Sequence, residues 1–213
     1  MIYGTAVADR FNLAANRGNI VGSRRHRVLV SGMYQLPVGK GRPFLNKLNG
    51  VGQAVLGGWE LSTVSLWQTG PWLTPITSPA FDSANLNLVY RGSLLRPDCA
   101  GDPNLANPTV DRYFDIGAFN PVPATGRIGN CGVGIMKGPG TLAIAGGLSK
   151  TFAIRERVHL RLEATFTNLP NHPNFAPPAV DVSAPATFGK ITSVQSAENS
   201  GNRTGQLALR LDF

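Results

Sequence analysis

The residues that could carry catalysis or bind a metal are few and widely separated in this sequence. The histidines stand at positions 26, 159 and 172, and none has the short spacing that presents two ligands to one metal ion. Glu163 and Asp212 offer carboxylates, but the sequence shows no acid or base partner for either. We therefore expect no enzymatic activity, no cofactor and no metal.

Two further stretches suggest binding chemistry. The stretch GNCGVG at residues 129–134 has the glycine content of a phosphate loop, but no predicted strand precedes it and no helix follows, so its amides have no reason to converge. The run SRRHR at residues 23–27 concentrates positive charge. The net charge of +8 is otherwise spread along the chain with no aromatic stacking platform, so we expect no nucleic-acid partner.

Composition points to strands and loops as the elements that carry these residues. The chain has 25 glycines and 16 prolines among 213 residues, which disfavours long helices. Hydrophobic residues make up 42%, so disorder is not expected, and no apolar run is long enough for a transmembrane helix. The first residues, MIYGTAVADRFN, do not read as a secretory signal. The chain is therefore either cytosolic or a piece of a longer protein.

The two cysteines, Cys99 and Cys131, both lie in stretches rich in Gly, Pro and Asn, which are typical of loops. An even pair of this kind is compatible with a disulfide in an oxidising compartment. Two unpaired thiols are the alternative, and the choice depends on where the protein resides.

Alternation of apolar and polar side chains predicts five strands. The clearest is VHLRLEATFTN at residues 158–168, where the apolar positions are Val158, Leu160, Leu162, Ala164 and Phe166. The other four stretches cover residues 26–36, 58–70, 142–152 and 205–213. Lys150 breaks the apolar row of its strand.

The lengths of strands and connections predict an all-β fold, an antiparallel meander of long strands. Each stretch has about ten residues, enough for a tilted strand to cross a bilayer. The connection at 154–157 is short, whereas those at 69–140 and 168–204 are long, the asymmetry of an outer-membrane barrel. The connection at 37–57 should be short by parity, so we expect it to hold a brief helix or an extended hairpin. The alternative is a soluble β-sandwich that binds carbohydrate, with its polar faces in water.

Several blocks then follow one another in a familiar order: RRHRVLVSGMYQLPVGKGRPF, VLGGWELSTVSLWQTGPWLTP, GPGTLAIAGGLSKTFAIRERVHLRLEATFTNLPNHPNFAPP, ATFGKITS and LALRLDF. Together they resemble the C-terminal end of TonB-dependent receptors, and within these the Oar-like receptors that carry a carboxypeptidase-regulatory-like domain. The resemblance extends from about residue 10 to the end of the chain. The segment 80–101 departs from it.

This resemblance implies a transmembrane barrel of about 22 strands in the outer membrane of a Gram-negative-type bacterium, with an N-terminal plug and energy supplied through TonB. Residues 1–213 would be its C-terminal fragment, without the plug or the TonB-contacting segment, and not competent for transport alone. The ligand stays open among siderophores, cobalamin and oligosaccharides.

The resemblance also implies roles for residues on the last two strands. The terminal strand would be read by the barrel assembly machinery, because an unpaired strand edge offers free N–H and C=O groups for strand addition. The residues of this assembly signal are Leu207, Leu209, Leu211 and Phe213. The residues expected to face outer-membrane lipid on the preceding strand are Val158, Leu160, Leu162 and Phe166.

The implied orientation places Phe213 at the periplasmic rim and the two long loops, 69–140 and 168–204, outside the cell. Cys99 and Cys131 would then lie where a disulfide persists. The basic run would lie at the outer rim, and two interpretations of it stay open. It is either a solvated strand start or a contact to lipopolysaccharide phosphates, made by Arg24, Arg25 and Arg27.

Overall fold

The chain folds into two compact units in a computed structural model that describes residues 12–78, 80, 95–120, 126–155, 157–196 and 201–213. The strand unit comprises Arg27–Trp67, Thr141–Asn174 and Gln195–Phe213. The loop unit comprises the residues up to His26, with Gln68–Gly140 and Phe175–Val194. No helix in the described part of the chain is long and apolar enough to cross a membrane.

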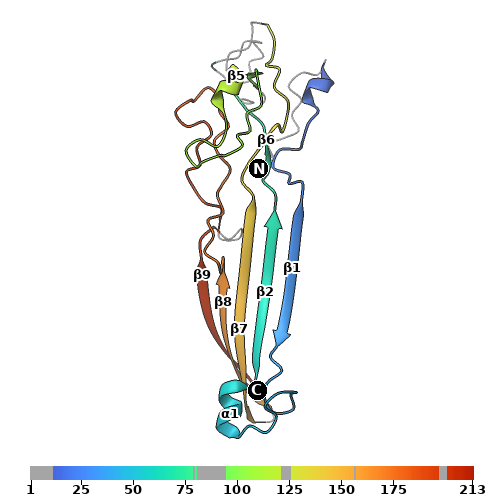
Figure 1. Cartoon of the computed structure of the whole chain (residues 1–213), viewed down its shortest axis with the longest axis vertical. Coiled ribbons are helices and arrows are strands. Elements are labelled where there is room, and N and C mark those ends of the chain that lie inside the picture. The colour runs from blue at the N-terminus through green and yellow to red at the C-terminus, as the bar shows by residue number, and fades with distance from the viewer. Residues whose placement is uncertain (1–11, 79, 81–94, 121–125, 156, 197–200) are drawn as a thin grey trace. The chain divides into compact units, whose positions relative to one another are not determined.

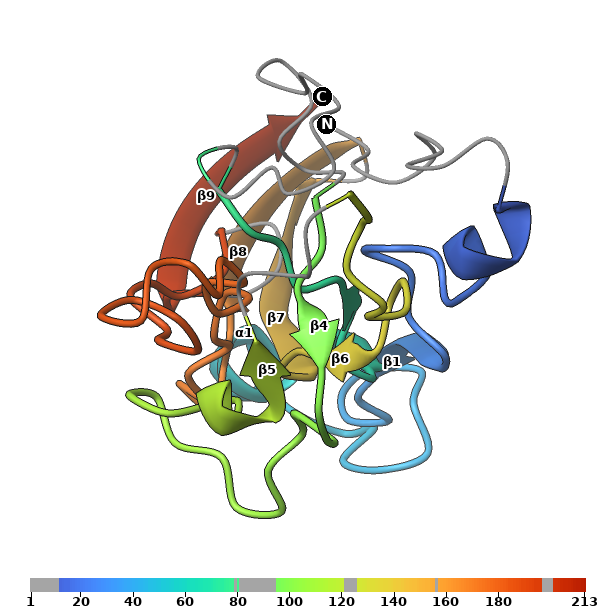
Figure 2. The same cartoon turned by 90° about the horizontal axis from the view of Figure 1, so that it is seen from above.

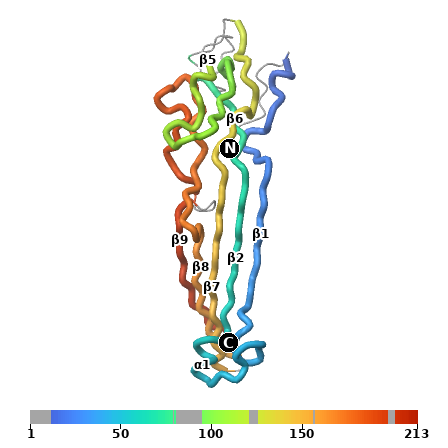
Figure 3. Tube along the Cα trace, viewed as in Figure 1, coloured from blue at the N-terminus to red at the C-terminus, as the bar shows by residue number. Residues whose placement is uncertain are grey.

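The strand unit is one antiparallel sheet whose strands follow the chain in the order β1-β2-β7-β8-β9 (Figure 1). The strands are β1 (Arg27–Gln35), β2 (Trp59–Gln68), β7 (Thr141–Arg155), β8 (Val158–Thr167) and β9 (Thr204–Asp212). All five coincide with the stretches that alternation predicted. The Cα trace in Figure 3 shows the up-and-down course of the meander, and Figure 2, turned to look along the strands, shows β7, β8 and β9 following a curve.

The register of the last three strands is continuous. Leu162 of β8 stands opposite Lys150 of β7 and Leu209 of β9, and the same alignment runs along both pairs of strands. One irregularity between Ala153 and Arg155 shifts the end of the β7–β8 pair. Because side chains directly opposite one another point to the same side of a sheet, this register fixes which residues share a face.

The connection between β1 and β2 contains the brief helix α1 (Gly50–Leu56), so the helix, and not the extended hairpin, is confirmed. Asn49 caps the helix, because its side-chain oxygen accepts a hydrogen bond from the amide of Gly52 at 2.7 Å. The helix ends at Gly57. It lies at the same end of the sheet as the C-terminus (Figure 1).

The loop unit has little regular structure but a packed core of its own. Its short elements are the 3-10 turns η1 (Leu13–Asn16) and η4 (Ile116–Ala118) and the strands β3 (Trp72–Leu73), β4 (Asp98–Cys99), β5 (Phe119–Asn120) and β6 (Met136–Lys137). β3 pairs with β6, and β4 pairs with β5. The buried core residues are Leu73, Phe114, Ala118, Phe119, Cys131, Met136, Val182 and Phe188. Burial of these side chains supplies the hydrophobic free energy that isolated loops lack.

Candidate functional site

The sheet of the strand unit has one apolar face. On the last three strands the register gives this face Phe152, Leu148, Gly146, Leu160, Leu162, Ala164, Phe166, Leu211, Leu209, Leu207 and Gly205, with Lys150 as its one charged member among them. Several of these side chains are open to the surroundings, and Leu207 is 82% exposed. A soluble β-sandwich would bury such a row against a second sheet, so the exposure argues against that alternative.

The opposite face of the same three strands is polar. It carries Thr151, Ser149, Gly147, His159, Arg161, Glu163, Thr165, Thr167, Asp212, Arg210, Ala208, Gln206 and Thr204. No large apolar side chain interrupts it. We call these two surfaces the apolar face and the polar face.

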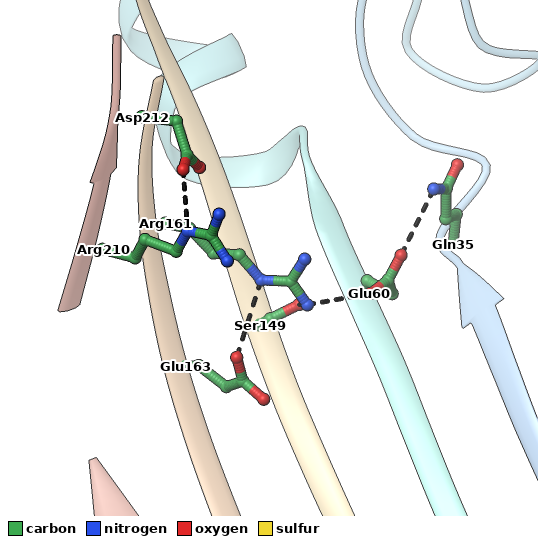
Figure 4. A network of polar contacts seen from close by, with 7 residues as sticks. All are labelled: Gln35, Glu60, Ser149, Arg161, Glu163, Arg210 and Asp212. Atoms are coloured by element: carbon green, nitrogen blue, oxygen red, sulfur yellow. Dashed lines mark hydrogen bonds and ion pairs between the residues drawn. The ribbon is translucent and has the colours of Figure 1, made fainter. Parts of the chain in front are cut away.

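The polar face is linked by a network of ion pairs around Arg161 (Figure 4). The Arg161 guanidinium lies 3.2 Å from a Glu60 carboxylate oxygen on β2 and 3.7 Å from Glu163 on its own strand. Ser149 of β7 also accepts a hydrogen bond from Arg161, and Gln35 of β1 donates one to Glu60. The network therefore joins β1, β2, β7 and β8 across one face.

These contacts also assign the first two strands to the faces. Gln35 and Glu60 belong to the polar face because they bond to one another and to Arg161. Successive side chains of a strand alternate in direction, so Tyr34 and Leu61 belong to the apolar face. The two faces thus continue over all five strands, but on the first two strands the polar face also carries apolar side chains: Leu29, Met33, Val64 and Leu66.

Small residues hollow the apolar face. A groove of about 620 Å³ lies over Gly32, Gly146 and Ala164, and its sides include Tyr34, Leu61, Leu148, Phe166 and Leu169. The ring of Phe166 also covers Gly205 on β9, where a Cβ atom would stand 2.8 Å from the ring. A side chain at position 205 would therefore displace this aromatic ring from the last strand pair.

Lys150 is the exception on the apolar face, and α1 explains it. Its ammonium donates hydrogen bonds to the carbonyl oxygens of Val55 at 3.0 Å and Gly57 at 2.6 Å, at the C-terminal end of α1. It also lies 4.5 Å from the ring centroid of Trp59 and 5.1 Å from that of Phe152. Only 5% of Lys150 is exposed. Helix C-termini and aromatic faces both attract cations, so the charge is accommodated although the face is apolar.

The residues expected to form the assembly signal lie along an edge of the sheet. β9 pairs with β8 on one side, and the sheet order places it last, so its other side has no partner strand among the described residues. Leu207, Leu209 and Leu211 share the apolar face, and Phe213 follows them at 96% exposure. The other edge strand is β1.

A long antiparallel sheet with one apolar and one polar face is the structure of a barrel wall between lipid and water. The family model of the outer membrane beta barrel domain matches residues 2–206. The chain belongs to this family. No curated protein and no solved structure matches it. The chain is therefore an all-β protein of the outer membrane.

In this outer membrane barrel protein, the lipid-facing residues expected from the sequence lie together. Leu160, Leu162 and Phe166 stand on the apolar face by register, and Val158 shares that face by alternation along β8. Each is at least partly exposed.

The loop unit of the barrel protein contains the two cysteines, which form a disulfide. Hydrogen bonds to Asp98 further join the segment that contains Cys99 to the segment that contains Cys131. Arg127 donates to both carboxylate oxygens of Asp98 at 2.7 Å, and the Asn130 amide donates to one of them at 3.0 Å. These hydrogen bonds, first of all those from Arg127, lower the pKa of Asp98.

A buried arginine ties three segments of the loop unit together. Arg96 is almost fully buried and donates to the carbonyl oxygens of Ala15 and Cys131, each at 2.8 Å. Burial lowers the pKa of Arg96. Close by, Gly129 lies so near the backbone that a Cβ atom would stand 2.0 Å from the Arg96 carbonyl oxygen. The sequence analysis did not predict this packing around Arg96, although it singled out the stretch GNCGVG, which begins with Gly129.

The basic run is only partly available for ligands. Arg24 is half-buried and donates to the carbonyl oxygen of Thr69 at 2.8 Å. Arg25 and Arg27 are exposed. A contact to lipid phosphates would therefore rest first on these two.

Within the described ranges, no group of three or more His, Cys, Asp or Glu side chains could hold a metal ion. Glu163 and Asp212, which lacked partners in the sequence, pair with Arg161 and Arg210 on the polar face. Parts of the long loops, at 81–94, 121–125 and 197–200, and the start of the chain lie outside the described residues.

Proposed function

We propose that the chain is the C-terminal part of a TonB-dependent receptor, Oar-like in type, that takes up a siderophore, cobalamin or an oligosaccharide with energy from TonB. The role is transport and not catalysis, and it requires the plug and the remaining strands of a complete barrel of about 22 strands. The order of sequence blocks supports the receptor type, and family membership supports the barrel.

One observation carries the proposal: the two-faced sheet ends in two free edges. β1 and β9 both lack an outer partner among the described strands. Small closed barrels need about eight strands, so five cannot enclose a lumen. The polar face nevertheless carries a charge network suited to a wet interior. A sheet of this kind is best understood as one sector of a larger barrel, closed by preceding strands.

The proposal also assigns partners. The β9 edge with Leu207, Leu209, Leu211 and Phe213 offers the barrel assembly machinery a strand to pair with. The long loops 69–140 and 168–204 would lie outside the cell and contribute to ligand capture. Arg25 and Arg27 would contact lipopolysaccharide phosphates. TonB would act only through the N-terminal part of the receptor.

The test is uptake in the native host. Deleting the reading frame that encodes this chain should abolish high-affinity uptake of one radiolabelled ligand among a ferric siderophore, cobalamin and a maltooligosaccharide. Deleting TonB should abolish uptake of the same ligand, because both parts serve one energy-coupled step. Unchanged uptake of all three ligands in the first strain, or uptake that persists without TonB, would refute the receptor assignment.

A further inference from the structure

We propose that the connection between β1 and β2, residues 37–57, is a membrane anchor that lies on the barrel's lipid-facing side and binds anionic phospholipid headgroups at the rim. We call these residues the α1 connection. The proposal goes beyond ligand uptake, since it concerns how this sector of the barrel is held at the membrane surface.

The first step is that α1 lies on the apolar face. Lys150 belongs to that face, and its ammonium bonds to the last carbonyl oxygens of α1. The indole N–H of Trp59 also donates to the Val55 carbonyl oxygen at 2.9 Å. The helix is thus tied to the side of the sheet that contacts lipid.

The second step is depth. Lys150 stands level with Leu209, four residues before Phe213. A strand rises about 3.3 Å per residue, so Lys150 lies roughly 13 Å along the strand from the end of the chain. Lysine side chains at such depths direct their ammonium toward the interface. Carbonyl oxygens of the α1 connection accept hydrogen bonds from that ammonium, so the connection lies at the rim of the barrel.

The third step is the surface that the connection presents. Val51 and Val55 are four residues apart on α1 and point the same way. Val51 is 74% exposed, and Val55 and Leu56 are exposed as well. Phe44 and Leu45 precede the helix and are also exposed. Apolar side chains gathered on a short segment beside a lipid-facing sheet match the interface between acyl chains and headgroups.

The fourth step is charge. Residues 37–57 contain Lys40, Arg42 and Lys47 and no acidic residue. Arg42 donates to the side-chain oxygen of Gln35 on the polar face at 2.7 Å, so Lys40 and Lys47 are the cations left for the lipid. Each basic side chain near an anionic membrane surface strengthens the attraction to it. The connection is held together by Gln53, whose side-chain oxygen accepts from the Lys40 amide at 2.6 Å. Basic and apolar groups therefore stay on one small, tied segment.

The experiment uses the complete barrel that contains this chain, reconstituted into phosphatidylethanolamine and phosphatidylglycerol vesicles, with an environment-sensitive fluorophore on Val51→Cys. The native cysteines are paired and do not react with the label. Matched labels on Leu209→Cys and Asn107→Cys report the apolar face and the exposed surface of the loop unit. Circular dichroism checks that each variant keeps its sheet.

We expect brominated lipids to quench the label at position 51 about as strongly as the label at 209, and iodide to quench only the label at 107. Brominated phosphatidylglycerol should quench position 51 severalfold more than an equal fraction of brominated phosphatidylethanolamine, since each basic residue favours anionic lipid by about fivefold. The double substitution K40Q/K47Q should equalise the two lipids. Iodide quenching at 51 equal to that at 107 overturns the anchor, and equal quenching by the two lipids before the double substitution overturns the anionic preference.

Discussion

Replacing Lys150 with methionine should release α1 from the sheet while leaving the sheet intact. Methionine keeps an apolar stem of similar length against Trp59 and Phe152 but removes the ammonium. The lost interactions are two hydrogen bonds from a charged donor, at 3.0 and 2.6 Å, and the contacts of the cation with two rings.

The magnitude follows from these contacts. Hydrogen bonds to a charged group contribute roughly 1.5–3 kcal/mol each, and the cation over an aromatic ring adds about 0.5–1 kcal/mol. The helix carbonyls can turn to water or headgroups when α1 detaches, which offsets much of the loss. We expect the free energy of opening α1 to fall by about 2 kcal/mol, which corresponds to about 30-fold faster exchange of its amides.

Hydrogen exchange is the assay. The amides of Gln53 and Gly57 report the helix, because they donate to the carbonyl oxygens of Asn49 at 2.8 Å and Gln53 at 3.0 Å. The control is Lys190→Met, an exposed lysine of the loop unit. Exchange at these two amides that changes less than twofold in Lys150→Met, as in the control, would refute the assigned role of the ammonium.

Three further outcomes follow from contacts in the two units. Arg127 depresses the pKa of Asp98 in the folded protein, so their interaction stabilises the loop unit above the unfolded pKa of 3.8. This stabilisation is lost as the pH falls through the lower folded pKa. Asp98→Asn should therefore flatten the acid unfolding curve of the loop unit, as followed by tryptophan fluorescence. Reduction of the disulfide, which spans 32 residues, should lower the free energy of unfolding of the loop unit by about 3–4 kcal/mol and speed its limited proteolysis. Leu209→Arg should destabilise the inserted protein by roughly 2–4 kcal/mol in urea titrations, whereas Ala208→Arg on the polar face should cost far less; equal losses would contradict the assignment of faces.

The strands could be predicted because their signal is local. Alternation over 158–168 and 205–213 needs only neighbouring residues, and both stretches form strands with the expected faces. Lys150 broke the pattern of its strand for a reason that lies elsewhere in the chain, at the carbonyl oxygens of Val55 and Gly57. No periodicity in residues 142–152 could reveal that partner.

The loop unit could not be predicted in the same way. Its core joins Phe114 to Phe188, whose rings lie 6.3 Å apart but whose positions differ by more than seventy residues in sequence. Neither residue sits in a periodic stretch, so only the long-range fold brings them together. The cysteine pair could be predicted because the sequence contains two cysteines, which allow a single disulfide. The buried Arg96 gave no comparable signal.

The order in which the chain leaves the inner membrane constrains how this core can form. Val182 and Phe188 complete it, yet they follow β8, and the partners they cover, such as Phe114 and Met136, come earlier. Those earlier apolar side chains stay exposed to water in the periplasm until Val182 and Phe188 have been exported. The protein should therefore depend on holding chaperones during transit, and a nonsense codon soon after β8 would remove part of this core as well as β9.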